Sequence, residues 1–159
     1  MTRPARARID LDALRHNYAL ARRLHGGRAL AVLKANAYGH GLVPLGRVAA
    51  TEGCLMLGVA TLEEAAALRD AGITAPILLM VSPHMDQLDE VVRLDLRLGL
   101  SDLEMATRLG EIAERLDQVA RVHVKVDTGM GRQGFHEREA VEAMRKIARI
   151  ARLDVEGIA

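Results

Sequence analysis

The sequence predicts an α/β protein with a parallel sheet, because short apolar segments alternate with capped amphipathic segments along the chain. The apolar segments recur at intervals of roughly 25 residues, the spacing of repeated strand-then-helix units. Half of the 159 residues are hydrophobic, which is enough to form a packed core.

Strands are predicted where apolar residues run without a break or alternate with polar ones. Residues 29–33 (ALAVL) are apolar throughout, which is typical of a strand covered on both faces. Residues 121–127 alternate strictly, so that His123, Lys125 and Asp127 are expected on one face. The predicted strands cover residues 29–33, 54–60, 77–81, 97–100, 121–127 and 153–158.

Helices are predicted between these strands by their caps and their apolar spacing. Asp10 is a suitable N-cap, and Pro44 fits a first helical turn. The sequences TLEE (residues 61–64) and SDLE (residues 101–104) each form a capping box. The predicted helices cover residues 11–24, 44–53, 61–72, 85–94, 101–116 and 137–150.

Two architectures fit this pattern: a doubly wound open sheet and an eight-stranded barrel. The sequence contains about six strand–helix units, whereas a complete barrel typically needs about 250 residues. A barrel formed by this chain would therefore be incomplete.

Composition excludes several classes of function. The chain has 22 Lys and Arg residues against 21 Asp and Glu residues, so it lacks the excess of positive charge that favours nucleic-acid binding. No apolar run is long enough for a membrane helix. The single Cys54 excludes an intrachain disulfide and is expected to be an inert core residue, while the start MTRPARARID has no apolar signal segment. The six histidines show no metal-ligand spacing. We expect a cytoplasmic protein with a small-molecule substrate, no nucleic-acid or membrane partner and no metal.

Lys34 is the first candidate for chemistry. It is one of only three lysines and follows the predicted strand 29–33, at the edge where parallel α/β folds place reactive groups. A partly desolvated amine there is nucleophilic toward an aldehyde. The alternative is a structural lysine that reaches solvent from a strand end. Tyr38 follows in a loop with Gly39 and Gly41, which permit close backbone approach.

The second candidate is the segment KVDTGMGRQGF (residues 125–135). It contains G-x-G-x-x-G, and Asp154 lies twenty residues beyond Gly134, as in a dinucleotide-binding fingerprint. Against that interpretation, Asp127 would bring a carboxylate near the pyrophosphate, and the motif comes late in the chain. Arg132 is better suited to a carboxylate or phenolate oxygen, which its guanidinium binds in a bidentate manner.

These segments resemble a known family. VLKANAYGHG (residues 32–41) and KVDTGMGRQGF are similar to the two N-terminal signatures of bacterial alanine racemases, pyridoxal-phosphate enzymes built on a barrel plus a β domain. ARARIDLDALRHN (residues 5–17) and LDVEGIA (residues 153–159) also resemble the family. The resemblance implies an incomplete (β/α)8 TIM-type barrel, with residues 1–159 forming the N-terminal part of the cofactor-binding barrel domain and the C-terminal β domain absent.

The resemblance also implies roles for individual residues. Lys34 would hold pyridoxal 5'-phosphate covalently and act as one of two bases at the substrate Cα, and Tyr38 would bind the cofactor phosphate. Arg132 would contact the substrate carboxylate and the cofactor's phenolic oxygen. Lys125 matches a position that is carbamylated in many members, and Gln133 stands where a leucine is common.

The implied function is racemisation of L-alanine to D-alanine for peptidoglycan, by a homodimer that uses two bases. The second base, a tyrosine from the partner's C-terminal domain, and the arginine that pairs with the pyridine nitrogen have no counterpart here, so this chain alone is expected to be inactive. The alternatives are a broad-specificity amino-acid racemase and a non-catalytic carrier of pyridoxal phosphate, and Arg132 argues against the carrier.

Overall fold

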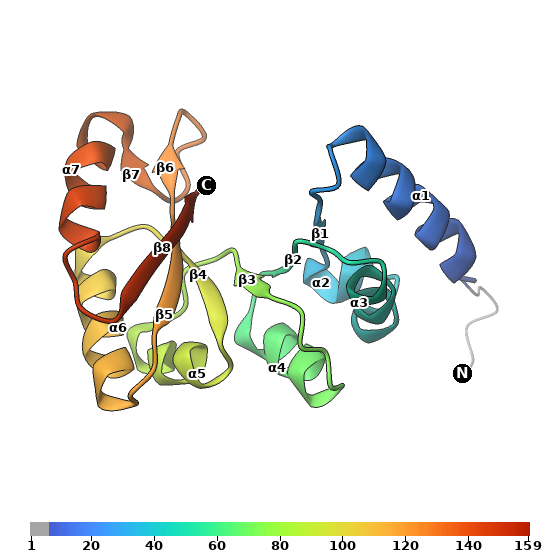
Figure 1. The fold of residues 1–159 in the computed structure, drawn as a ribbon, viewed down its shortest axis with the longest axis horizontal. Helices are drawn as coiled ribbons and strands as arrows, with labels where there is room; N and C mark the ends of the chain where they lie inside the picture. The colour runs from blue at the N-terminus through green and yellow to red at the C-terminus, as the bar shows by residue number, and fades with distance from the viewer. Residues whose placement is uncertain (1–6) are drawn as a thin grey trace, which may run out of the picture.

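Six parallel strands lie side by side in the order in which the chain forms them (Figure 1). The computed structural model describes residues 7–159, so part of the start in which we expect no signal peptide lies outside the described residues. The strands of this sheet are β1 (Leu30–Val32), β2 (Met56–Val59), β3 (Ile77–Leu79), β4 (Leu96–Leu100), β5 (Ala120–Val124) and β8 (Leu153–Ile158). A doubly wound sheet reverses its strand order at a switch point, whereas this order, β1-β2-β3-β4-β5-β8, never reverses. The sheet is therefore part of a barrel, as predicted.

Helices connect the strands. They are α1 (Leu11–Leu24), α2 (Lys34–Tyr38), α3 (Leu42–Thr51), α4 (Leu62–Asp70), the 3₁₀ turn η1 (Met85–Gln87), α5 (Leu88–Arg93), α6 (Leu103–Arg115) and α7 (Glu137–Ile147). The right-handed crossovers of parallel strands place such helices on one face of the sheet. Leu57, Leu98 and Val122 are fully buried in the core that the sheet shares with residues of these helices. No helix within residues 7–159 combines the length and the apolar character needed to cross a membrane.

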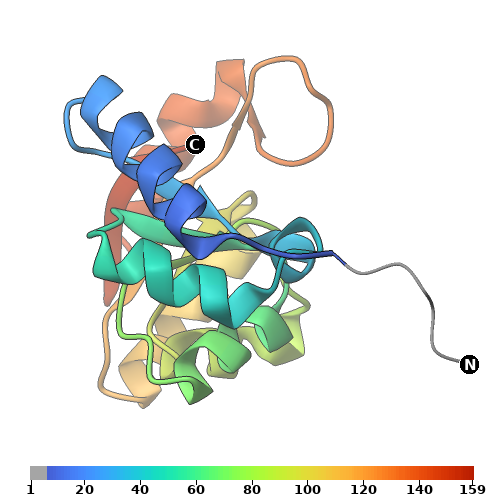
Figure 2. The same cartoon turned by 90° about the vertical axis from the view of Figure 1, so that its right-hand side faces the viewer.

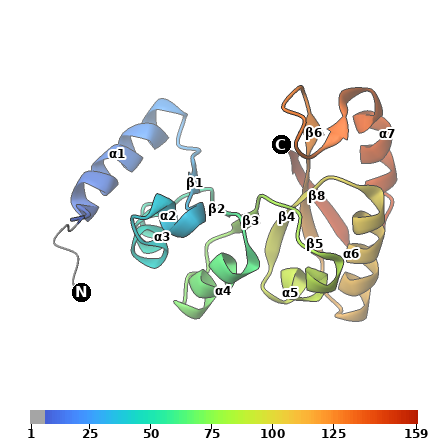
Figure 3. The same ribbon diagram turned by 180° about the vertical axis from the view of Figure 1, so that it is seen from behind.

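Different helices cover the two ends of the sheet. At the β1 end, α1 lies across α3 (Figure 2), and the predicted cap is confirmed because the Asp10 carboxylate accepts from the amides of Asp12 and Ala13. At the β8 end, α6 packs against α7 (Figure 3).

Cys54 lies just before β2 and is only half-buried, and this burial raises the pKa of its thiol.

Several details differ from the sequence predictions. Residues 29–33 are not covered throughout, because Leu33 is buried but the three residues of β1, an edge strand of the described sheet, are only half-buried. The helix predicted from Ser101 is capped instead by Asp102, whose carboxylate accepts from Met105 N at 2.7 Å. The helix predicted over residues 85–94 is divided into η1 and α5.

The strand predicted over residues 121–127 is also divided. β5 ends at Val124, and β6 (Val126–Asp127) pairs with β7 (Phe135–His136) in a separate two-stranded sheet. Lys125 lies between them, and its amide donates to Leu100 O while its carbonyl accepts from Phe135 N. Asp127 therefore does not share the face of His123 and Lys125.

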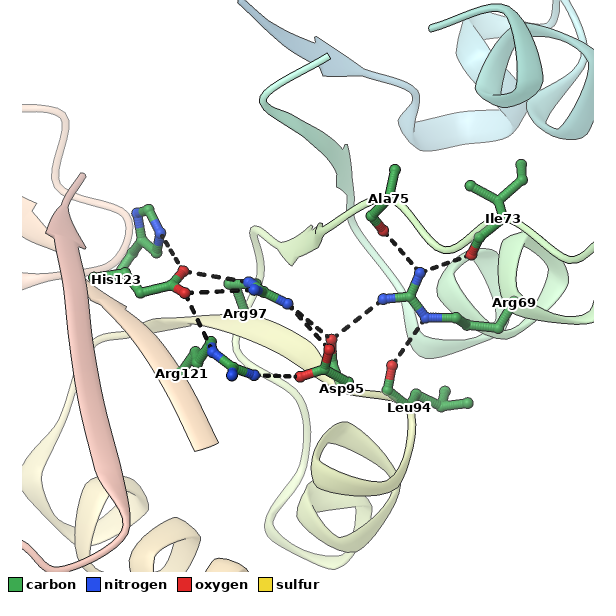
Figure 4. A network of polar contacts seen from close by, with 9 residues as sticks. Arg69, Ile73, Ala75, Leu94, Asp95, Arg97, Arg121 and His123 are labelled. Carbon is green, nitrogen blue, oxygen red and sulfur yellow. Dashed lines mark hydrogen bonds and ion pairs between the residues drawn. The ribbon is translucent and has the colours of Figure 1, made fainter. Parts of the chain in front are cut away.

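The face of the sheet opposite the helices carries a network of charged residues (Figure 4). Glu156 on β8 accepts from Arg97 on β4 at 3.2 and 3.4 Å and pairs with Arg121 on β5 at 3.4 Å. Asp95 pairs with the same two arginines at 3.3 and 2.8 Å. His123 Nε2 lies 3.7 Å from Glu156, beyond hydrogen-bond distance.

Candidate active site

Lys34 lies two residues beyond β1, at the carboxyl edge of the sheet, as predicted, and it is half-buried. The four residues after it form a left-handed helical turn, with φ of 53° at Ala35, 53° at Asn36, 52° at Ala37 and 55° at Tyr38. Residues with a Cβ are disfavoured in this conformation by roughly 1–2 kcal/mol each. The turn was not predicted, because alanines are more typical of ordinary right-handed helices.

Polar contacts hold the left-handed turn in place. Asn36 Oδ1 accepts from Leu42 N at 2.8 Å, and the Asn36 carbonyl accepts from the amides of Gly39 and Gly41. The Asn36 amide donates to Glu64 Oε1 at 3.3 Å. Such accumulated strain is characteristic of functional segments, where the surrounding structure maintains it.

Lys125 reaches the same edge from β5. Its side chain crosses Gly99 on β4, since a Cβ added to that glycine would lie 3.3 Å from Lys125 Cδ. Its Nζ lies 3.5 Å from the carbonyl oxygen of Met80, the residue after β3. The absent side chain at Gly99 therefore leaves room for the ammonium to extend toward β3.

Arg132 lies in the loop between β6 and β7, and Asp127 organises that loop. Asp127 Oδ1 accepts from Gly129 N at 2.9 Å and from Gly131 N at 3.0 Å. The hydrogen bonds from Gly131 and Gly129 lower the pKa of the Asp127 carboxyl. The carboxylate thus fixes the backbone on the N-terminal side of Arg132.

These elements surround a cavity of about 310 Å³ at the carboxyl edge of the sheet. Its lining residues are Lys34, Met80, Val81, Lys125, Arg132 and Gln133. Three of the six carry positive charge and none carries negative charge, so the cavity suits an anionic ligand with carboxylate or phosphate groups. The structure therefore brings together three of the four predicted site residues.

Tyr38, the fourth predicted residue, does not line this cavity, and its side chain is 60% exposed. Gln133 does line it, although the sequence analysis treated this residue only as a departure from a family pattern. Sequence reasoning placed Glu64 only in a capping box and missed its contact with the turn after Lys34. The available signal was its place in the TLEE box, where a carboxylate is expected to bind backbone amides.

The geometry does not support the dinucleotide-binding interpretation of residues 129–134. That motif needs free glycine amides leading directly into a helix. Here Asp127 occupies the amides of Gly129 and Gly131, and β7 separates the loop from α7.

Comparison with known proteins identifies the family to which this fold and this cavity belong. Residues 9–159 match the family model described as alanine racemase, N-terminal domain. The chain belongs to this family. An alanine racemase from Symbiobacterium thermophilum is 44% identical over 157 residues, which cover 98% of this chain and 42% of that protein. An alanine racemase from Methanococcus maripaludis is 40% identical over 161 residues, which cover 99% of this chain and 43% of that protein.

Solved structures of alanine racemases share the fold. The alanine racemase of Clostridium difficile 630 in complex with cycloserine superposes with a TM-score of 0.85 at 31% identity, covering 92% of this chain and 40% of that one. The chain thus spans less than half the length of these alanine racemases. The resemblance and the barrel architecture predicted from the sequence are confirmed.

Proposed function

We propose that this chain is part of a pyridoxal-phosphate-dependent alanine racemase that interconverts L- and D-alanine. The observation that carries the proposal is the convergence of Lys34, Lys125 and Arg132 on one cavity in a member of this family. A lysine amine beside two further cations suits an anionic aldehyde cofactor and an amino-acid carboxylate.

The donor set fits pyridoxal 5'-phosphate. Lys34 would hold the cofactor covalently through its amine, and the exposed Tyr38, four residues further along the chain, would bind the phosphate. When bound, the cofactor would acidify the Cα proton of the amino acid. Arg132 would bind the substrate carboxylate and the cofactor's phenolic oxygen, and a carbamate on Lys125 would accept a hydrogen bond from Arg132.

Racemisation requires a proton to leave one face of Cα and another to arrive on the opposite face. Lys34, once released from the cofactor, would serve one face. The base for the other face would come from outside residues 1–159, from a C-terminal β domain of the partner subunit in a homodimer. We assign the enzyme to the cytoplasm, where its product would supply peptidoglycan synthesis.

Covalent labelling tests this function directly. Borohydride reduction of the complete gene product with pyridoxal phosphate should fix the cofactor on Lys34, as peptide mass spectrometry would show. Lys34→Ala should abolish both the label and alanine racemisation, and Lys34→Arg should do the same, because arginine keeps the charge but cannot form the covalent link. A label found on Lys125 or Lys146 would contradict the assignment.

The same preparation distinguishes the two alternatives. Racemisation of many amino acids at rates similar to that of alanine would indicate a broad-specificity racemase. Cofactor fixed on Lys34 without racemisation of any amino acid would indicate a carrier of pyridoxal phosphate.

A further inference from the structure

Glu64 departs from the local role that its sequence position predicts. In a capping box the N3 glutamate accepts from the backbone amide of the N-cap residue, here Thr61. Thr61 makes the first of the two capping-box hydrogen bonds, since its hydroxyl accepts from Glu64 N at 3.3 Å. The Glu64 carboxylate instead accepts from Ala60 N at 2.9 Å and from Asn36 N at 3.3 Å.

These two contacts join three elements. Ala60 follows β2, Glu64 belongs to the first turn of α4, and Asn36 lies in the left-handed turn after Lys34. The first amides of any helical turn lack a partner within the turn, and the Asn36 amide is one of them. Glu64 therefore caps the left-handed turn from a neighbouring helix.

We infer that Glu64 is a positioning residue that holds the left-handed turn, and through it sets where Lys34 and Tyr38 meet the cofactor. The effect on cofactor binding rests on the proposed function, whereas the contact between Glu64 and the turn does not. Each carboxylate oxygen of Glu64 serves one amide, so the role needs two acceptor atoms. A glutamine supplies only one acceptor and would present its NH₂ group to the other amide.

The structure offers a matched control and a rescue. Glu63 is the neighbouring acidic residue in the same helical turn, but it is exposed and does not contact Asn36. Ala35 is exposed and has a φ of 53°, a conformation that glycine adopts without a Cβ penalty. If Glu64 acts by holding this conformation, Ala35→Gly should partly replace it.

The experiment compares Glu64→Gln, Glu64→Ala and Glu63→Gln in the complete gene product. Hydrogen exchange of the peptide covering residues 34–41, without cofactor, should be about tenfold faster in both Glu64 variants and unchanged in Glu63→Gln. Titration with pyridoxal phosphate should show affinity about tenfold weaker in both Glu64 variants. Adding Ala35→Gly to Glu64→Ala should recover part of that affinity, whereas Ala66→Gly on α4 should recover none.

Hydrogen exchange and cofactor affinity test different parts of the inference, so each can contradict it independently. Unchanged exchange in Glu64→Ala and Glu64→Gln would overturn the inference whatever the cofactor does. Faster exchange with cofactor affinity equal to that of the wild type would overturn the positioning role. If the wild-type protein itself formed no adduct on Lys34, the proposed function would fall, and the exchange data would still decide the contact.

Discussion

Lys125 and Arg132 are two cations on one cavity, and their mutual repulsion has to be relieved for both to act there. Carbamylation would convert the Lys125 amine into an anion that accepts a charge-assisted hydrogen bond. Lys125→Ala should therefore lower racemase activity, with partial recovery when acetate or another small carboxylate is added. Lys146→Ala on α7 removes a lysine outside this cavity and should leave the activity unchanged. Equal activity with and without bicarbonate would argue against the carbamate.

Asp127 gives the Arg132 loop a defined pH dependence. The depressed pKa of its carboxyl means that its stabilisation of the loop is fully present above the ordinary aspartate pKa of about 3.9. That stabilisation is lost as the pH falls through the lower, folded-state value. Amide exchange at Gly129 and Gly131, corrected for its intrinsic pH dependence, should show protection that persists through pH 5 and disappears only in stronger acid. Asp127→Asn, which cannot titrate, should show no such transition.

At the scale of elements, the charged network joins β4, β5 and β8, and Glu156 is its acceptor on the last strand. Glu156→Gln should lower the free energy of unfolding by about 1–2 kcal/mol, because two partly buried arginines lose one of their two anionic partners and keep only Asp95. Asp154→Asn on the same strand should change it by less than about 0.5 kcal/mol, because Asp154 takes no part in the ion pairs of this network. Denaturant titration of the complete gene product measures both. Equal effects of the two variants would mean that the network contributes nothing specific.

Element positions were largely predictable, because apolar periodicity and caps are local signals. The strand 153–158 and the helix begun by Asp10 lie where the sequence predicts them. Departures occur where tertiary contacts override local preference. The alanines of KANAY adopt a left-handed turn held by Glu64 from α4, and the strand at residues 121–127 divides at Lys125 because Phe135 returns to bind its carbonyl. The position of Lys34 at a strand end made it a candidate but left a structural role open. The roles of the individual site residues came from motif resemblance.

At the scale of the whole molecule, β1 and β8 are the outer strands of the six-stranded sheet. Unpaired strand edges favour pairing with other chains. A polypeptide of these 159 residues made alone should therefore self-associate with increasing concentration, as sedimentation velocity would show. It should also exchange the alanine α-proton slowly at most, because only one proposed base is present. Turnover at ordinary enzyme rates of roughly 1–10³ per second by this polypeptide would show that one base suffices.

The unreversed strand order has a consequence for synthesis on the ribosome. Each strand of the sheet after β1 pairs with the sheet strand that was translated before it. β8 pairs with the free edge of β5 after the chain has formed β6, β7 and α7. No strand has to be inserted between two partners that are already paired. The sheet can therefore grow by addition at a single edge as the chain emerges, and Lys34 and its left-handed turn can be packed against β2 and α4 well before Arg132 is translated.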